Sequence, residues 1–401
     1  MSVPLDRLYH YLADCVNHDL LIYRWAPHGS RKLEDLDQLM NYPEVKWYHS
    51  PIAVFHDQEP LNHAFYSAEQ IKNCAEMLFL RDNRPAMLAN SVLDYLSRQH
   101  FRGITCCVNQ YDLTILVHSE WHSAEVDVFA QCGFVPVYYW SHAVIAQDWF
   151  RYAEHDPMLE FDLSTIQQDF LIYNRAWAGT REYRLCFAEQ LLANRLEQYC
   201  NISFDPEDGE HYSTHQFAND QFKIVNYNLH DELRLNTHDS AASADYCSED
   251  YATTGIEVVL ETVFDDHRWH LTEKTLRPIA CGKPFILMAT PGSLQYLKQY
   301  GFETFGELID ESYDQIVNHR QRLQAVIAEM TRISSMSLES KNQLYIKLNA
   351  IAKRNKQRFF NGLHDQVINE YKANMDHAMR TMQQHCTGQH LAQIEELINQ
   401  Q

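Results

Sequence analysis

The residues with the clearest chemical pattern lie in the segment His270–Ile286. Thr272 is a suitable N-cap for a helix, and Glu273 and Lys274 fall in its first turn. Gly282 ends that helix before a buried strand. The start of such a helix faces the carboxyl end of the preceding strand, which is where ligands bind in open α/β sheets. Exposed backbone N–H groups beside a lysine suit a phosphate group, and Glu273 could accept hydrogen bonds from sugar hydroxyls.

The string Leu271–Lys274, followed by Gly282-Lys283-Pro284, resembles the donor-binding signature of the α1,3-fucosyltransferase family, within the GT-B class of glycosyltransferases. The resemblance implies that Glu273 contacts the ribose hydroxyls of a nucleotide-sugar, that Lys274 contacts its diphosphate, and that Thr272 belongs to the same donor site. An ordinary capped helix with an exposed salt-bridging pair would explain the same residues.

Arginines that follow another strand extend the resemblance. Asn174-Arg175 ends a strand, and Arg181 and Arg184 follow on the next helix, which is similar to the strand Asn and Arg-bearing helix of the same family. Arginine forks bind diphosphate oxygens at two points, so Arg175 and Arg181 are predicted to clamp the diphosphate. The resemblance implies that Asn174 belongs to the same donor site. Surface arginines on a helix are the alternative. The segment from Pro291 to Asp314 also resembles a block in phage-encoded and bacterial glycosyltransferase-like proteins.

Acidic residues in the first half follow predicted strands and could supply a general base. Asp57 and Glu59 come after the strand Ile52–His56, and Glu120 and His118 lie at the end of another. The turn resembles the one that carries the base in fucosyltransferases, with Glu59 the best match. A base there would deprotonate an acceptor hydroxyl. A polar loop with Glu59 solvated and Asp57 capping is the alternative.

Metal-binding patterns are weak in this chain. His118 and His122 stand four apart, but their order with Glu120 differs from that of zinc peptidases. Asp265-Asp266 lacks the spacing of the D-x-D metal motif of GT-A enzymes, and GT-B enzymes usually need no metal. We therefore expect no metal site and no cofactor, the nucleotide-sugar being a substrate.

The elements that must position these residues alternate between strands and helices, which predicts parallel sheets covered by helices. A helical stretch is expected from roughly Ser67 to His100, with a break at Pro85, and another from Arg181 to Arg195. The predicted strands are Leu20–Trp25, Ile52–His56, Leu113–His118, Phe134–Tyr139, Phe170–Asn174, Phe222–Tyr227, Ile256–Glu261 and Lys283–Met288.

The length of 401 residues favours about two domains. The predicted fold class is α/β, with two Rossmann-like domains of GT-B type and a C-terminal helical extension. The expected domains are an acceptor domain at 1–165, a nucleotide-sugar domain at 166–315 and the extension at 316–401. The resemblance is clearest over roughly 168–315. It implies a hexosyl- or pentosyltransferase that moves a sugar from a nucleotide-sugar to the hydroxyl of an acceptor.

Charge and composition limit the function further. There are 33 basic and 54 acidic residues, a net charge of −21, which argues against a generally basic nucleic-acid binder. No apolar run approaches the ~18 residues of a membrane span. A start without a basic and apolar leader favours the cytoplasm of a bacterium or phage-infected cell. The acceptor could be a glycan, a small molecule or DNA carrying a hydroxymethylated base, since a base-flipping enzyme needs only one basic groove. A non-catalytic two-domain binding or assembly protein is the other alternative.

Overall fold

The computed structural model describes most of the chain, in two compact units. The central unit is His142–Gln366, and the N-terminal unit joins Val3–Ser141 to Val367–Gln401. We describe residues 3, 7–16, 20–24, 31–32, 46–48, 51–75, 77–80, 85–87, 104–107, 111, 113–174, 176–205, 210–233 and 244–386.

The central unit contains a four-stranded parallel sheet with the order β11-β10-β12-β13. Apolar residues dominate these strands, as expected for a sheet that is buried on both faces. The strand of this sheet that comes first in sequence, β10, lies inside the sheet. The later strands are therefore added on both sides of it, as in Rossmann-like folds. The strands are β10 (Gln168–Asn174), β11 (Cys200–Phe204), β12 (Thr254–Leu260) and β13 (Phe285–Met288).

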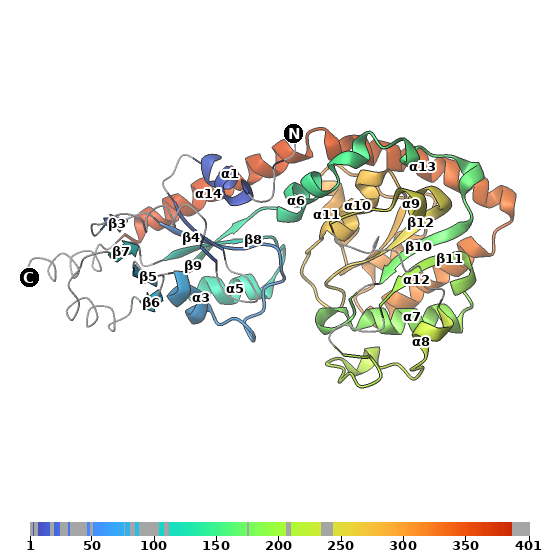
Figure 1. The fold of residues 1–401 in the computed structure, drawn as a ribbon, viewed down its shortest axis with the longest axis horizontal. Coiled ribbons are helices and arrows are strands. Elements are labelled where there is room, and N and C mark those ends of the chain that lie inside the picture. Colours follow the sequence, from blue (N-terminus) through green and yellow to red (C-terminus); the bar gives the residue numbers. More distant parts are fainter. Residues whose placement is uncertain are drawn as a thin grey trace, which may run out of the picture. The chain divides into compact units, whose positions relative to one another are not determined.

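Helices cover both faces of this sheet (Figure 1). α7 (Tyr183–Ala193) and α12 (His319–Ser334) lie on one face, while α9 (Ser248–Thr253), α10 (Glu273–Cys281) and α13 (Leu338–Phe360) lie on the other. The remaining α-helices of this unit are α6 (Ser141–Trp149), whose first residue belongs to the N-terminal unit, α8 (Leu229–Glu232) and α11 (Ser293–Gln299). Its 3₁₀ helices are η2 (Arg151–Glu154), η3 (Pro157–Leu159), η4 (Leu163–Thr165), η5 (Gly179–Arg181), η6 (Glu197–Tyr199), η7 (Asp220–Phe222) and η9 (Glu311–Gln315).

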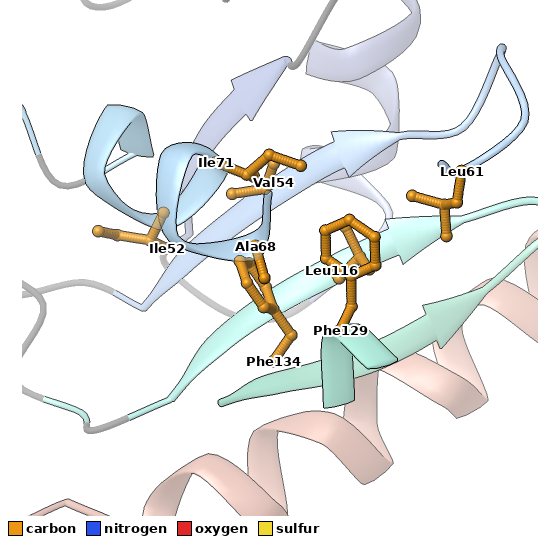
Figure 2. Packing of buried hydrophobic residues seen from close by; sticks show 8 residues of the cluster. All are labelled: Ile52, Val54, Leu61, Ala68, Ile71, Leu116, Phe129 and Phe134. Atoms are coloured by element: carbon orange, nitrogen blue, oxygen red, sulfur yellow. The ribbon is translucent and has the colours of Figure 1, made fainter. Parts of the chain in front are cut away.

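The N-terminal unit is built on a sheet with the order β2-β1-β4-β8-β9, parallel except for β2. Figure 2 shows the core on one of its faces, where alternate residues of the strands pack against two helices. The elements are α1 (Leu8–Asp14), β1 (Leu21–Arg24), β2 (Arg31–Lys32), β4 (Ile52–His56), α3 (Ala68–Ala75), β8 (Thr114–His118), α5 (Ala124–Gln131), β9 (Phe134–Tyr138) and α14 (Leu363–Gln384), whose first four residues belong to the central unit. The core residues are Ile52, Val54, Leu61, Ala68, Ile71, Leu116, Phe129 and Phe134.

The helix predicted from Ser67 to His100 is wrong beyond Ala75. A small second sheet with the order β3-β7-β5-β6 takes its place there, and residues 88–100 lie outside the described part of the chain. Leu80 and Pro85 stand at the ends of two antiparallel strands, so the proline begins a strand rather than breaking a helix. The strands are β3 (Lys46–Tyr48), β5 (Met77–Leu80), β6 (Pro85–Met87) and β7 (Ile104–Cys107).

The strand predicted at Phe222–Tyr227 is also wrong. Phe222 ends a 3₁₀ helix, and the backbone N–H groups of Val225 and Asn226 both donate to the Glu189 carboxylate at 2.7 Å. This side chain satisfies the amides that a neighbouring strand would otherwise have paired. The other predicted strands are present, with ends that differ by a few residues.

The two units divide the chain differently from the predicted domains. The first boundary follows Ser141, and residues 142–165 belong to the central unit. α12 and α13 belong to that unit too, instead of forming a separate extension. Among the residues that the structure describes, no helix is long and apolar enough to cross a membrane.

Candidate functional site

The carboxyl edge of the central sheet is anchored by a buried carboxylate, Glu261, directly after β12. One oxygen accepts from the backbone N–H of Thr272 at 2.9 Å and from the Thr275 hydroxyl at 2.5 Å. The other accepts from the Thr272 hydroxyl at 2.7 Å and from the N–H of Thr262 at 3.1 Å. Glu261 is fully buried. It therefore fixes the start of α10 against the end of β12.

Thr272 caps α10 as predicted. Its side-chain oxygen accepts from the N–H of Lys274 at 3.4 Å while its hydroxyl donates to Glu261. The Thr272 hydroxyl thus both donates and accepts a hydrogen bond within the protein. Thr272 is a positioning residue for the two that follow it.

Glu273 and Lys274 form an ion pair at this helix start, with 2.6 Å between Nζ and Oε1. The other carboxylate oxygen of Glu273 lies 3.3 Å from Nδ1 of His142. Burial alone would raise the pKa of Glu273, but Lys274 and His142 outweigh it and hold the pKa well below its usual range. The Glu273 side chain is buried, whereas 21% of the Lys274 side chain is exposed. Lys274 is thus the accessible cation of the pair.

Arg184 crosses the point between β10 and β12 where the strand order reverses. Its guanidinium donates to the carbonyls of Leu260 at 2.5 Å and Glu261 at 3.0 Å, and to that of Ala176. Nδ2 of Asn174, the last residue of β10, donates to the Arg184 carbonyl at 3.3 Å. Burial lowers the pKa of Arg184. These two residues tie the ends of the strands together, and the Asn174 side chain is buried.

Arg181 differs from Arg184 in its surroundings. It ends η5, is half-buried and forms no hydrogen bond or ion pair in the part of the chain that the structure describes. It lies near enough to Arg184 to lower the pKa of that residue. The predicted donor residue Arg175 lies outside the described residues. Among the described residues, Lys274 and Arg181 are thus cations at this edge that an anion could contact.

The acidic pair considered as a metal motif is occupied by protein partners. Oδ2 of Asp266 lies 2.7 Å from the Arg268 guanidinium, and Oδ2 of Asp265 accepts from Asn219 at 3.0 Å. No group of three or more His, Cys, Asp or Glu side chains within the described ranges has the geometry of a metal site.

At the carboxyl edge of the N-terminal sheet, Asp57 is buried among tyrosines. Oδ1 accepts from the Tyr9 hydroxyl at 3.1 Å, and Oδ2 accepts from the Tyr139 hydroxyl. Burial and the nearby carboxylate raise the pKa of Tyr139 well above its ordinary value, so it stays a donor. Both oxygens of Asp57 are thus engaged in holding α1 and the end of β9 to β4.

Glu120 is engaged in the same manner, whereas the Glu59 side chain has no such partner among the described residues. One oxygen of Glu120 accepts from the N–H of Leu61 and the other from the Ser123 hydroxyl, both at 2.5 Å. The side chain is buried. Glu59 is exposed, just past the end of β4. Of the three predicted candidates for the base, Glu59 alone has its carboxylate in solvent.

Two buried histidines lie side by side beneath this edge. His56 and His118 are partners in the register of β4 and β8. Burial lowers the pKa of His56 to about 4 and that of His118 to about 3, so both are neutral at pH 7. Nδ1 of His118 accepts from the N–H of Glu120 at 3.3 Å. Neither ring nitrogen of His56 has a hydrogen-bond partner within the described residues.

Several of these residues carry no signal in the sequence. His142 reaches Glu273 from α6, far away in the chain, and His56 differs from other strand residues only in its position at a strand end. Glu261 could have been noticed, because it is an acid at the end of a predicted strand and stands shortly before a predicted N-cap.

Comparison with known proteins adds no family to this description. No protein-family model, no curated protein and no solved structure matches the chain.

Proposed function

We propose that the protein is a glycosyltransferase that moves a hexose or pentose from a nucleotide-sugar to an acceptor hydroxyl, with the nucleotide at the carboxyl edge of the central sheet. The observation that carries the proposal is the Glu273–Lys274 pair at the start of α10, fixed by Glu261 beside the reversal of strand order. Open parallel sheets bind nucleotides at this position, and the strand order supports a Rossmann-like nucleotide site.

The charges at this edge suit a diphosphate. The Lys274 side chain is 21% exposed, and Arg181 has no hydrogen-bond or ion-pair partner within the described residues. The first turn of α10 adds the partial positive charge of a helix start. Glu273 is held ionised and can accept hydrogen bonds from ribose hydroxyls, sharing its oxygens with Lys274 and His142.

The proposed base is Glu59 of the N-terminal unit. Its carboxylate would take the proton of the acceptor hydroxyl as the acceptor oxygen bonds to the anomeric carbon. The bond from that carbon to the diphosphate oxygen breaks, and its electron pair leaves with the nucleoside diphosphate. Asp57 and Glu120 are less suited because protein donors already occupy their oxygens.

Lysine, arginine and a helix start can offset the charge of the leaving group, so the proposed reaction needs no metal ion. We expect turnover to persist in EDTA. Complete loss of activity that manganese restores would contradict this part of the proposal.

Nucleotide binding tests the proposal directly. UDP- and GDP-sugars are titrated against the full chain by calorimetry, in parallel with Lys274→Ala and with Lys298→Ala, an exposed lysine of α11, as the matched control. We expect binding of one nucleotide class that Lys274→Ala weakens and Lys298→Ala does not. Absence of binding to every nucleotide-sugar would overturn the proposal in favour of a non-catalytic binding protein.

Candidate acceptors are then offered with the donor that binds: glycans, small hydroxylated molecules, and DNA carrying hydroxymethylated bases. Mass spectrometry of the acceptor reports the transferred sugar. Donor binding without transfer to any of the three would leave a nucleotide-sugar-binding protein and contradict the transferase proposal.

A further inference from the structure

A cavity of about 360 Å³ lies in the central unit at the carboxyl end of α10. The second half of α13 and the segment around η2 and η3 form its other walls. Its size falls in the range of small-molecule sites. The lining residues are Glu154, Leu159, Glu160, Phe161, Cys281, Gly282, Asn349, Lys353, Lys356, Gln357, Phe360 and Asn361.

This cavity is separate from the proposed nucleotide site. It meets the last residue of α10, Cys281, whereas Lys274 lies in the first turn of the same helix. The length of that helix, at about 1.5 Å per residue, separates the two. A ligand in the cavity would therefore neither contact nor displace a nucleotide at the start of α10.

The charges of the lining balance. Lys353 and Lys356 oppose Glu154 and Glu160. Within the described part of the chain, neither lysine forms an ion pair, and Glu160 has none either. The negative end of the α10 dipole also faces this region, which disfavours an anion. The two ammonium groups disfavour a cation. The cavity thus suits a neutral ligand.

The remaining lining residues offer hydrogen bonds of both kinds beside apolar surface. The side-chain amides of Asn349, Gln357 and Asn361 supply both donor and acceptor groups. Phe161, which is 36% exposed, and Phe360 present aromatic rings. A sugar ring has apolar C–H faces that can lie on such rings and hydroxyls that both donate and accept.

We infer that this cavity is a binding site for a neutral saccharide of one or two rings, distinct from any nucleotide site. The inference rests on the lining alone and does not depend on the proposed transfer reaction.

The test uses saturation-transfer NMR and calorimetry on the full chain with neutral mono- and disaccharides as probes, with and without saturating UDP and GDP. The variant is Lys353→Ala/Gln357→Ala, two exposed lining residues of α13. The control is Lys347→Ala/Gln343→Ala, exposed residues of the same helix that do not line the cavity. Loss of two hydrogen-bonding groups should weaken binding about tenfold or more in the variant and leave it unchanged in the control.

Phenyl phosphate and benzylamine serve as charged probes of the same cavity. Binding of either one in preference to every saccharide, or saccharide binding that the variant does not alter, would overturn the inference. Absence of saccharide binding would overturn it as well. Competition by UDP or GDP would place the sugar at the nucleotide site and contradict a separate one. Because nucleotide binding is measured independently through Lys274→Ala, failure here leaves the proposed transferase function standing, and the reverse also holds.

Discussion

The carboxyl edges of the two parallel sheets use buried carboxylates for the same purpose but differ in the charge that they leave exposed. In the central unit, Glu261 fixes the start of α10, and the accessible charged groups among the described residues include the cations Lys274 and Arg181. In the N-terminal unit, Asp57 and Glu120 fix neighbouring segments, and a carboxylate, Glu59, stands in solvent.

This difference shows that the position of an acidic residue at a strand end is not in itself evidence of a catalytic or ligand-binding role. A carboxylate whose oxygens already accept from hydroxyls and backbone amides stabilises the protein. A charged residue nearby whose side chain is exposed, such as Lys274 or Glu59, is better placed to contact a ligand. One edge then suits an anion, and the other suits a proton donor such as a hydroxyl.

The largest expected effect concerns the exposed carboxylate. Glu59→Gln should lower turnover about 10²–10⁴-fold if Glu59 is the general base, with donor affinity unchanged. Steady-state rates at saturating donor measure this, and calorimetry checks the donor. In Asp57→Asn and Glu120→Gln the loss should fall mainly on stability. If either of those abolishes turnover per folded molecule while Glu59→Gln does not, the roles assigned to the two kinds of carboxylate are reversed.

The buried carboxylate of the central edge should matter for stability. Glu261→Gln replaces one acceptor oxygen by an NH₂ group that faces the hydrogen-bond donors of Thr262, Thr272 or Thr275. Because hydrogen bonds to a charged group are lost, the free energy of unfolding should fall by about 3 kcal/mol. Urea unfolding measures the loss. Glu249→Gln, on the exposed side of α9, is the control and should change little. A stable Glu261→Gln protein with impaired nucleotide binding would instead make Glu261 part of the ligand site.

The partly exposed cation of the same edge, Lys274, should affect nucleotide binding. Lys274→Ala removes a charge-assisted hydrogen bond worth about 1.5–3 kcal/mol, so nucleotide affinity should fall about tenfold or more. The melting temperature should fall as well, because the buried Glu273 carboxylate loses the cation that lowers its pKa most. Glu273→Gln should weaken nucleotides more than it weakens pyrophosphate, and an equal loss for both would contradict its ribose role.

The smallest expected effect is a pH dependence of stability that arises from the two buried histidines of the N-terminal sheet, His56 and His118. The pKa values of His56 and His118, about 4 and about 3, lie below the ordinary 6.5 of the unfolded chain. Between about pH 4 and 6.5 the unfolded state therefore binds more protons than the folded state. The two histidines do not lower the free energy of unfolding above pH 6.5, and they lower it progressively as the pH drops through that range. His56→Phe removes one titrating ring and should make this fall shallower, as urea titrations between pH 5 and 7 would show. An unchanged slope would mean that the His56 ring is not kept neutral by burial.

Much of the parallel strand framework could be predicted from sequence, because buried strands such as Ile52–His56 read as short apolar runs. The wrong strand prediction at Phe222–Tyr227 arose from a different strand pattern, the alternation of apolar and polar positions. Phe222 and Ile224 are buried and Lys223 and Val225 are exposed, which imitates a strand. A single side chain on α7, Glu189, binds the amides there, and no local pattern reveals such a partner.

The candidate site was predictable to a different extent on the two edges. The Thr272 cap and the Glu273–Lys274 pair follow from local spacing, and the structure contains both. The burial of Asp57 depends on Tyr9 and Tyr139, which approach from distant parts of the chain. The same holds for Glu120, whose donor Leu61 belongs to another loop. Local sequence therefore located these carboxylates but could not show that they were already occupied.

The discontinuous make-up of the N-terminal unit has a consequence for its biosynthesis. Tyr371 of α14 packs against Tyr139, with 5.4 Å between the ring centres, and Asn374 donates to the Tyr138 carbonyl at 2.8 Å. These residues leave the ribosome only after the whole central unit has been made. The central unit can fold during translation as an uninterrupted segment, whereas the N-terminal unit must wait for α14. A stop codon shortly after Gln366 would thus leave the central unit complete but would remove most of α14 from the N-terminal unit.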